Sequence, residues 1–170
     1  ATKHLIKEGC TKIAHLAGDQ SLEIYQNRFE GYKQALIDHG ISFNEKYVLR
    51  TKSNVDAGIN AAKTLLSLDN PPDAIFSSSD FAGLGAIQEV KEQGIAIPND
   101  FCVVGFGNEP FTKFMELSIS SVDQSPMEMG KMAAKVFLEQ INNTNNLKIE
   151  KKVVLVPELL TRKSSNRQNK

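Results

Sequence analysis

The strongest constraint on the fold is a unit that occurs four times in the sequence, a short apolar run that ends abruptly in small or polar residues. In the clearest copy, the turn Pro98-Asn99-Asp100 precedes the run Cys102–Val104, and Gly105 and Gly107 follow it. The other runs are Lys12–Leu16, Tyr47–Arg50 and Ala74–Phe76. Uninterrupted apolar runs of this length are typical of parallel strands that are buried on both faces.

The segments between these runs show the periodicity of amphipathic helices. Apolar residues recur three and four positions apart: Phe29, Tyr32, Ala35 and Leu36; Ile59, Ala62, Leu65 and Leu66; Leu84, Ile87 and Val90. Strands that alternate with helices predict an α/β fold with three layers, α/β/α, in which helices cover both faces of a parallel sheet. Ligands of such sheets bind beyond the carboxyl ends of the strands.

The alternation stops after Asn108. Residues 125–128 have the form of a capping box with Pro126 at the first helical position. The helix that follows has an apolar face made by Met129, Met132, Ala133, Val136, Phe137 and Ile141. This face belongs either to a core or to a contact with a second lobe or a dimer partner, and the pattern fits both.

A polar loop at 142–146 then leads to a last predicted strand, Val153–Val156. The basic and polar residues from Arg162 to Lys170 predict a solvated, partly disordered tail.

Composition limits the classes of partner. Twenty basic residues balance twenty acidic ones, so the chain has no overall basic field that would draw it onto nucleic acid. No stretch is long and apolar enough to cross a membrane. The chain starts at Ala1 and enters a helical pattern at once, which predicts an internal position in a longer protein.

The cysteines and histidines predict no metal site, no cofactor and no catalytic residue. Cys10 and Cys102 are far apart and resemble packed, reduced thiols, although a disulfide between them stays open. His4, His15 and His39 lack the spacing of metal ligands. A phosphate-binding glycine loop and a nucleophile elbow are also missing, which disfavours an enzyme on a flavodoxin-like or Rossmann-like sheet.

A family resemblance follows from the order and spacing of motifs over nearly the whole chain. They are His4–Ile6, Ile13–Gly18, Arg28 with Gly31-Tyr32, Pro72–Phe76 with Asp80, Val103–Phe106, Ser121–Gln124 and Pro157–Ser164. With these motifs the chain resembles the regulatory core of the LacI/GalR family of bacterial transcription regulators.

The resemblance implies a two-lobed core of the periplasmic-binding-protein-like type I, with a small-molecule effector, such as a carbohydrate, between the lobes. It also implies a cytoplasmic homodimer that binds operator DNA through an amino-terminal domain outside this chain. By the same resemblance, residues 1–119 form the C-terminal lobe, 120–146 cross to the N-terminal lobe, 147–164 return, and 165–170 form a disordered tail.

The resemblance further implies a set of effector-binding positions: Arg28, Ser79, Asp80, Leu22, Ile24, Ser53, Gly107, Asn108 and Gln124. A guanidinium at Arg28 can hold two hydroxyls or a carboxylate in a fork, and its alternative role is an ion pair with a carboxylate such as Asp80. Asp80 is equally suited to cap the helix that follows it. Leu22 and Ile24 would pack against a ring of the effector.

Two positions depart from the family pattern. Gly107 stands where many sugar-binding members carry an aspartate that accepts hydrogen bonds from hydroxyls. The resemblance then leaves two alternatives: Asn108 or Glu109 replaces the aspartate, or the effector is larger or differently oriented than a simple aldohexose. Ser53 stands where some members carry an aromatic platform.

An alternative function shares the two-lobed architecture, namely that of a periplasmic solute-binding protein of a transporter. The patterns at 98–106 and 159–164 favour the regulator.

Overall fold

The computed structural model describes residues 1–141 and 152–167. Its sheet has six strands in the order β2-β1-β3-β4-β5-β6. The strands are β1 (Ile13–Leu16), β2 (Val48–Leu49), β3 (Ala74–Ser77), β4 (Cys102–Phe106), β5 (Ser120–Asp123) and β6 (Glu158–Leu160). The first five run parallel, and β6 pairs antiparallel with β5.

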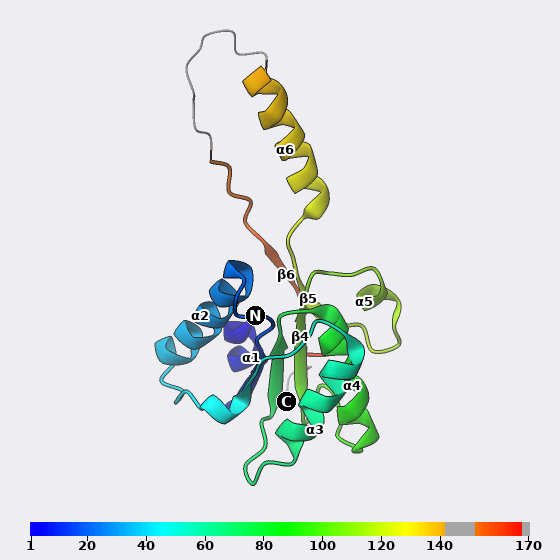
Figure 1. Cartoon of the computed structure of the whole chain (residues 1–170). Helices are drawn as coiled ribbons and strands as arrows, with labels where there is room; N and C mark the ends of the chain where they lie inside the picture. The colour runs from blue at the N-terminus through cyan, green and yellow to red at the C-terminus, as the bar shows by residue number, and fades with distance from the viewer. Residues whose placement is uncertain (142–151, 168–170) are drawn as a thin grey trace.

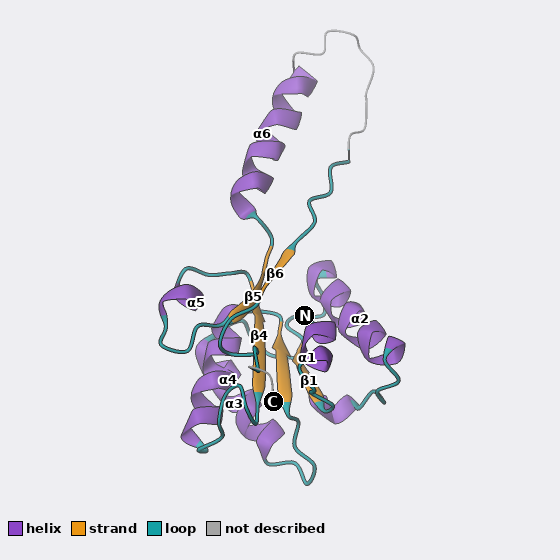
Figure 2. Cartoon of the chain, turned by 180° about the vertical axis from the view of Figure 1, so that it is seen from behind, coloured by secondary structure: helices purple, strands orange, loops and turns teal. Residues whose placement is uncertain are grey.

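Helices cover both faces of the sheet, which confirms the three-layer α/β/α prediction (Figures 1 and 2). The helices are α1 (Thr2–Lys7), α2 (Glu23–Asp38), α3 (Val55–Leu66), α4 (Asp80–Glu92), the short α5 (Phe111–Phe114) and α6 (Pro126–Ile141), with a 3-10 turn at Glu45–Tyr47. Successive strand residues enter two different core clusters, because side chains alternate between the faces of a sheet. Ile75 packs with α3 and α4, whereas its neighbours Ala74 and Phe76 pack with α1 and α2.

Two glycines let α3 and α4 approach each other closely. A Cβ atom on Gly58 would collide with the carbonyl oxygen of Ala82, and one on Gly85 would collide with that of Val55. Asn54 begins α3 as a cap, because its side chain accepts a hydrogen bond from Ala57 N–H at 2.9 Å. This tight helix pair forms one outer layer and fixes the sheet beneath it.

The last strand lies later than predicted. Residues 153–156 have no strand geometry, and β6 occupies Glu158–Leu160 instead. A strand needs a neighbour, and β5 ends at Asp123, which lies opposite Glu158. Beyond that point the described chain offers residues 153–156 no strand with which to pair.

The expectation of a solvated tail is wrong for Ser164, Ser165 and Arg167, whereas Asn166 is exposed. Ser164 and Ser165 are fully buried, because the segment runs beside β4 and β5. Val103 N–H donates to the carbonyl of Ser164 at 2.8 Å, and the Ser164 hydroxyl donates back to the carbonyl of Val103. Arg167 donates to Pro98 O at 2.9 Å. Residues 168–170 and the predicted loop at 142–146 lie outside the described residues.

Helix α6 stands away from the sheet on two connecting segments (Figure 1). It begins at Pro126 as predicted, but Ser125 has φ +53° rather than the extended backbone of a capping residue. No residue of α6 is buried, and Phe137 and Ile141 are 62% and 60% exposed. The apolar face of α6 is therefore not part of this lobe's core.

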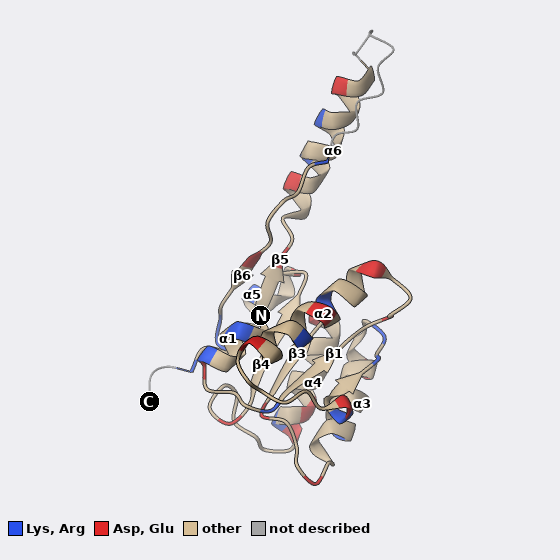
Figure 3. Cartoon of the chain, turned by 90° about the vertical axis from the view of Figure 1, so that its left-hand side faces the viewer, with Lys and Arg blue, Asp and Glu red and all other residues tan. Residues whose placement is uncertain are grey.

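Charges of both signs are interspersed along the helices (Figure 3). Among the described residues, no helix is long and apolar enough to span a membrane.

The histidines and cysteines lie in structural positions. Cys10 and Cys102 are free, buried thiols in one core cluster. His15 lies on β1 between aromatic rings, stacked on Tyr32 and Phe76 with ring centroids 4.9 and 4.8 Å away. Its Nδ1 is 2.9 Å from the carbonyl oxygen of Phe76, which requires a hydrogen on that nitrogen. Desolvation lowers the pKa of His15 to about 4.

This burial predicts a loss of stability in mild acid. Between the folded pKa near 4 and the ordinary value near 6.5, the unfolded chain holds the extra proton, so stability falls as pH drops through this window. We expect His15 to contribute about 2 kcal/mol to the loss of unfolding free energy between pH 7 and pH 5. Urea unfolding at both pH values measures it.

His15→Phe keeps the ring stack but cannot titrate, so its pH dependence should be smaller than that of the parent. His39 is exposed at the end of α2, and His39→Phe is the matched control. An equal pH dependence in the parent and His15→Phe would contradict the prediction.

Candidate functional site

The candidate site lies at the edge of the sheet where the parallel strands end. The loops after β1, β3, β4 and β5 meet there, and the connections to α6 leave from the same edge (Figure 1). Parallel strands gather the residues that follow them in this way, although these residues are distant in sequence.

Arg28 lies in α2, with its guanidinium carbon 3.7 Å above the centre of the Phe106 ring and 5.1 Å from that of Tyr25. Its Nη1 donates to the carbonyl oxygen of Ser78 at 3.0 Å. Desolvation lowers the pKa of Arg28, but a guanidinium stays charged. The cation therefore lies over two aromatic rings and donates to a backbone carbonyl, and the alternative ion pair with Asp80 is not formed.

Asp80 does not cap its own helix. It is the first residue of α4, after the N-cap Ser79, and its buried carboxylate points to other elements. Ser121 Oγ donates to Oδ1 at 2.7 Å, and Glu109 N–H donates to Oδ2 at 2.8 Å. Desolvation raises the pKa of Asp80, while these two hydrogen bonds oppose the shift. A Cβ atom on Gly105 would collide with Oδ1, so glycine at that position makes room for the carboxylate.

The loop after β4 has an unusual backbone. Gly107 has φ +127° and Asn108 has φ +52°. An aspartate at position 107 would be strained, and its Cβ atom would lie 3.4 Å from Asp80 Oδ2. The backbone of this loop thus favours glycine at position 107.

The side chain of Asn108 is engaged within the chain at both ends. Its Nδ2 donates to Asp123 Oδ2 at 2.8 Å, and its Oδ1 accepts from Arg162 Nη2 at 2.7 Å. Asn108 was one of two residues expected to replace the missing aspartate, and both polar atoms of its side chain are already used in contacts within the chain. Glu109 is half-buried beside Gly107.

The other predicted positions lie around this edge. Leu22 and Ile24 are 48% and 55% exposed near the start of α2 and form an apolar surface. Ser53 Oγ lies 3.0 Å from the hydroxyl of Tyr25, the residue that also flanks the Arg28 guanidinium. Ser79 and Gln124 are half-buried at the ends of β3 and β5.

Sequence reasoning missed four residues that shape this edge, namely Tyr25, Phe106, Ser121 and Arg162. Phe106 and Ser121 belonged to recognised motifs, but only the fold shows that they contact Arg28 and Asp80. Arg162 was assigned to the solvated tail, and its guanidinium instead contacts Asn108, Thr112 and Ile119.

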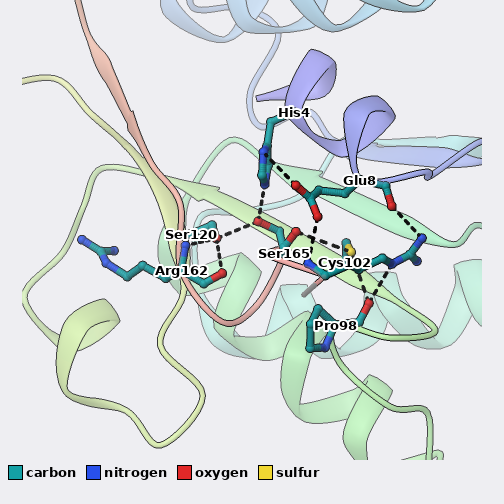
Figure 4. Close-up of polar contacts among 8 residues, drawn as sticks. His4, Glu8, Pro98, Cys102, Ser120, Arg162 and Ser165 are labelled. Atoms are coloured by element: carbon teal, nitrogen blue, oxygen red, sulfur yellow. Dashed lines mark hydrogen bonds and ion pairs between the residues drawn. The ribbon is translucent and has the colours of Figure 1, made fainter. Parts of the chain in front are cut away.

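A second polar cluster lies at the other end of β5 (Figure 4). Its residues follow one another as an acid, a histidine and a serine, as in a catalytic triad, but a substrate could not reach the serine. Glu8 Oε1 lies 3.9 Å from His4 Nδ1, and His4 Nε2 lies 2.7 Å from Ser165 Oγ. Ser165 is fully buried, and its hydroxyl donates to Ser120 Oγ at 2.7 Å. A nucleophile must reach its substrate, so this cluster is a structural contact between α1, β5 and the C-terminal segment.

Within residues 1–141 and 152–167, no three His, Cys, Asp or Glu side chains gather to hold a metal ion. The edge of the sheet thus offers a stacked cation, hydroxyls and exposed apolar side chains. This chemistry suits a ring-containing molecule with polar substituents.

Comparisons with known proteins agree with the fold. The family model described as periplasmic binding protein-like domain matches residues 2–165. The ribose operon repressor of Haemophilus influenzae is 32% identical over 145 residues, 85% of this chain and 44% of that protein. The transcriptional repressor CytR of Escherichia coli is 33% identical over 141 residues, 83% of this chain and 41% of that protein.

The structure is also similar to a transcriptional regulator CelR–cellobiose complex, with a TM-score of 0.88 and 31% identity over 97% of this chain and 50% of that chain. The chain therefore spans about half the length of its relatives or less.

The contacts of Asp80 predict a loss of stability in Asp80→Asn. An amide offers one acceptor where the carboxylate offers two, so either Glu109 N–H or the Ser121 hydroxyl loses its partner. We expect the unfolding free energy to fall by about 1–3 kcal/mol in urea unfolding at pH 7.

Asp19→Asn is the matched control. Asp19 is exposed and accepts from Ser21 N–H, so its change is expected to stay within about 0.5 kcal/mol. A loss in Asp80→Asn no larger than in this control would refute the role of the buried carboxylate.

Proposed function

The chain belongs to the periplasmic binding protein-like family, in its LacI/GalR branch of bacterial transcription regulators, and from this premise we propose that it is the effector-binding and dimerisation part of such a regulator. The observation that carries the proposal is the Arg28 guanidinium, stacked on Phe106 at the edge where the parallel strands end. The whole protein represses transcription, and a small-molecule effector controls its affinity for operator DNA.

The α6 arm belongs to the other lobe. Its two connections leave the sheet side by side as β5 and β6, and its apolar face is exposed. Met129, Met132, Ala133 and Val136 line a groove of about 320 Å³ together with Val153 and Leu155. A soluble domain rarely leaves such a face open, which supports contact with the N-terminal lobe that lies outside this chain. Residues 1–119 then form the C-terminal lobe together with the returning segment, of which the part from β6 at Glu158 to Ser164 lies on the sheet.

The effector is a carbohydrate or a related metabolite with a ring. A planar guanidinium can donate to two neighbouring hydroxyls, and the exposed Leu22 and Ile24 suit the apolar face of a sugar ring. The names of the ribose operon repressor and of the CelR–cellobiose complex support this class. Ser79, Ser53, Gly107 and Gln124 line the same wall, while Asp80 and Asn108 hold it in shape.

The regulator is a cytoplasmic homodimer that reads its operator through an amino-terminal domain. Repressors of this branch are the relatives of the chain, which supports operator binding. Exposed aromatic side chains outside the arm support self-association. Phe114 is 84% exposed, and Phe81 is 43% exposed and packs on Phe111 with ring centroids 5.0 Å apart. Effector binding, rather than catalysis, is the role of the site, because the relatives described above are transcription regulators.

The rival function, a periplasmic solute-binding protein, has less support. The relatives described above are transcription regulators, although the two classes share the lobed architecture.

Substitution of Arg28 tests the effector site. We expect Arg28→Ala, made in the full-length protein, to weaken effector binding by roughly 10- to 150-fold, the value of a hydrogen bond to a charged group. Calorimetry with a panel of mono- and disaccharides that includes ribose and cellobiose measures it. Lys33→Ala is the matched control, because Lys33 is also a cation over aromatic rings on α2 but lies five residues further along. Equal affinities in the parent and Arg28→Ala would remove Arg28 from the site.

Operator binding separates the regulator from the solute-binding protein. We expect the full-length protein to bind DNA from upstream of its own gene, and its effector to change that affinity by about 5- to 150-fold. Fluorescence anisotropy with and without the sugar measures this change. Binding of sugar without any binding of DNA would favour the solute-binding protein.

A further inference from the structure

A chain of side chains at the foot of the α6 arm connects the loop after β4 to both strands that carry the arm. Arg162 lies two residues after β6. Its Nη2 donates to Asn108 Oδ1 at 2.7 Å, while Nη1 donates to the carbonyl of Ile119 at 2.6 Å. Asn108 Nδ2 in turn donates to Asp123 Oδ2 at 2.8 Å. The side-chain amide of Asn108 therefore links the guanidinium of Arg162 to the carboxylate of Asp123.

Asp123 sets the course of the chain into the arm. It is the last residue of β5 and lies opposite Glu158, the first residue of β6. Its Oδ1 accepts from Ser125 N–H at 2.7 Å, and Ser125 takes the positive φ that turns the chain into α6. Two carboxylates directly opposite each other destabilise a strand pair. The Asn108 amide and the Arg162 cation offset this repulsion.

The loop is tied to β5 by its backbone as well. Asn108 N–H donates to Ser121 Oγ at 2.9 Å, and Gly107 N–H donates to the carbonyl of Val122 at 2.9 Å. The loop is therefore joined to β5, the strand that leads into the arm, by two backbone donors.

We infer that Arg162 is a positioning residue that, through Asn108, holds Asp123 and so fixes the direction of the α6 arm relative to the loop at 107–109. The regulatory meaning of this link rests on the proposed function, because an effector that contacts the loop would act on the arm through it. The link itself can be detected without effector or operator.

Arg167 offers a matched control in the same C-terminal segment. Its guanidinium also binds backbone carbonyls, those of Pro98 and Glu8, but it lies far from the arm. Figure 4 shows the side chain of Arg162 pointing away from Glu8 and Pro98. Arg162→Lys and Arg167→Lys each replace a guanidinium by an ammonium, which cannot make the forked contacts.

Hydrogen exchange of backbone amides, followed by mass spectrometry on the full-length protein, tests the inference. In Arg162→Lys we expect residues 107–109 and 121–125 to exchange about tenfold faster or more, since a hydrogen bond to a charged group is lost. In Arg167→Lys these segments should exchange as in the parent.

A second variant breaks only the last step of the link. Asn108→Asp tolerates the same positive φ and keeps an acceptor for Arg162, but it places a carboxylate against Asp123 in place of the amide donor. We expect faster exchange at 121–125 in this variant. It also decides the matter should Arg162→Lys not fold.

Unchanged exchange at 121–125 in these variants would overturn the inference. So would an increase of the same size in α3, because that would indicate a general loss of stability. The measurement uses neither sugar nor DNA, so a protein that fails to bind an operator would refute the proposed function and leave this result standing.

Discussion

The candidate site depends on one buried carboxylate. Asp80 stands between the end of β3 and the start of α4, and its two oxygens accept from β5 and from the loop after β4. A buried charge is costly unless hydrogen bonds satisfy it, so Ser121, Glu109 N–H and the space above Gly105 form a single unit with it. Because Asp80 joins the end of β3 to β5 and to the loop after β4, it holds together the elements near which Arg28 and Phe106 meet.

The C-terminal segment closes the structure from the opposite side. Ser164 bonds to the backbone of β4 and to Ser120 N–H, while Ser165 contacts His4 of α1. The hydroxyl of Ser164 thus bonds to backbone groups of β4 and β5 that no strand pairs with, since buried backbone N–H and C=O groups need a hydrogen-bond partner. The segment thereby ties the first helix to the last parallel strand, which are far apart in the sequence.

The sequence was sufficient to predict most of the fold and less of the site. Apolar runs and helical spacing gave β1, β3, β4 and the helices between them, because burial on two faces leaves a strong pattern. The pattern of polar residues misled at Ser164 and Ser165, since hydrogen bonding to a particular backbone, not composition, buries them. Asp80 was equally suited to cap α4, because a carboxylate at the start of a helix can accept from that helix's own N–H groups. Only the fold shows that it accepts from Ser121 and Glu109 instead. The placement of β6 depended on where β5 ends, which no local pattern records.

Gly107 connects these constraints to recognition. An aspartate there would require a left-handed backbone and would bring a second carboxylate close to Asp80, where the low dielectric strengthens repulsion. With this loop backbone and the buried Asp80 carboxylate, glycine is therefore favoured over aspartate at position 107. Polar recognition then depends on the other side of the edge, where the Arg28 cation lies on aromatic rings and a backbone carbonyl orients it. Under the proposed function, Arg28 contributes only donors, so it would contact acceptor atoms of the effector, while the neighbouring hydroxyls can donate or accept.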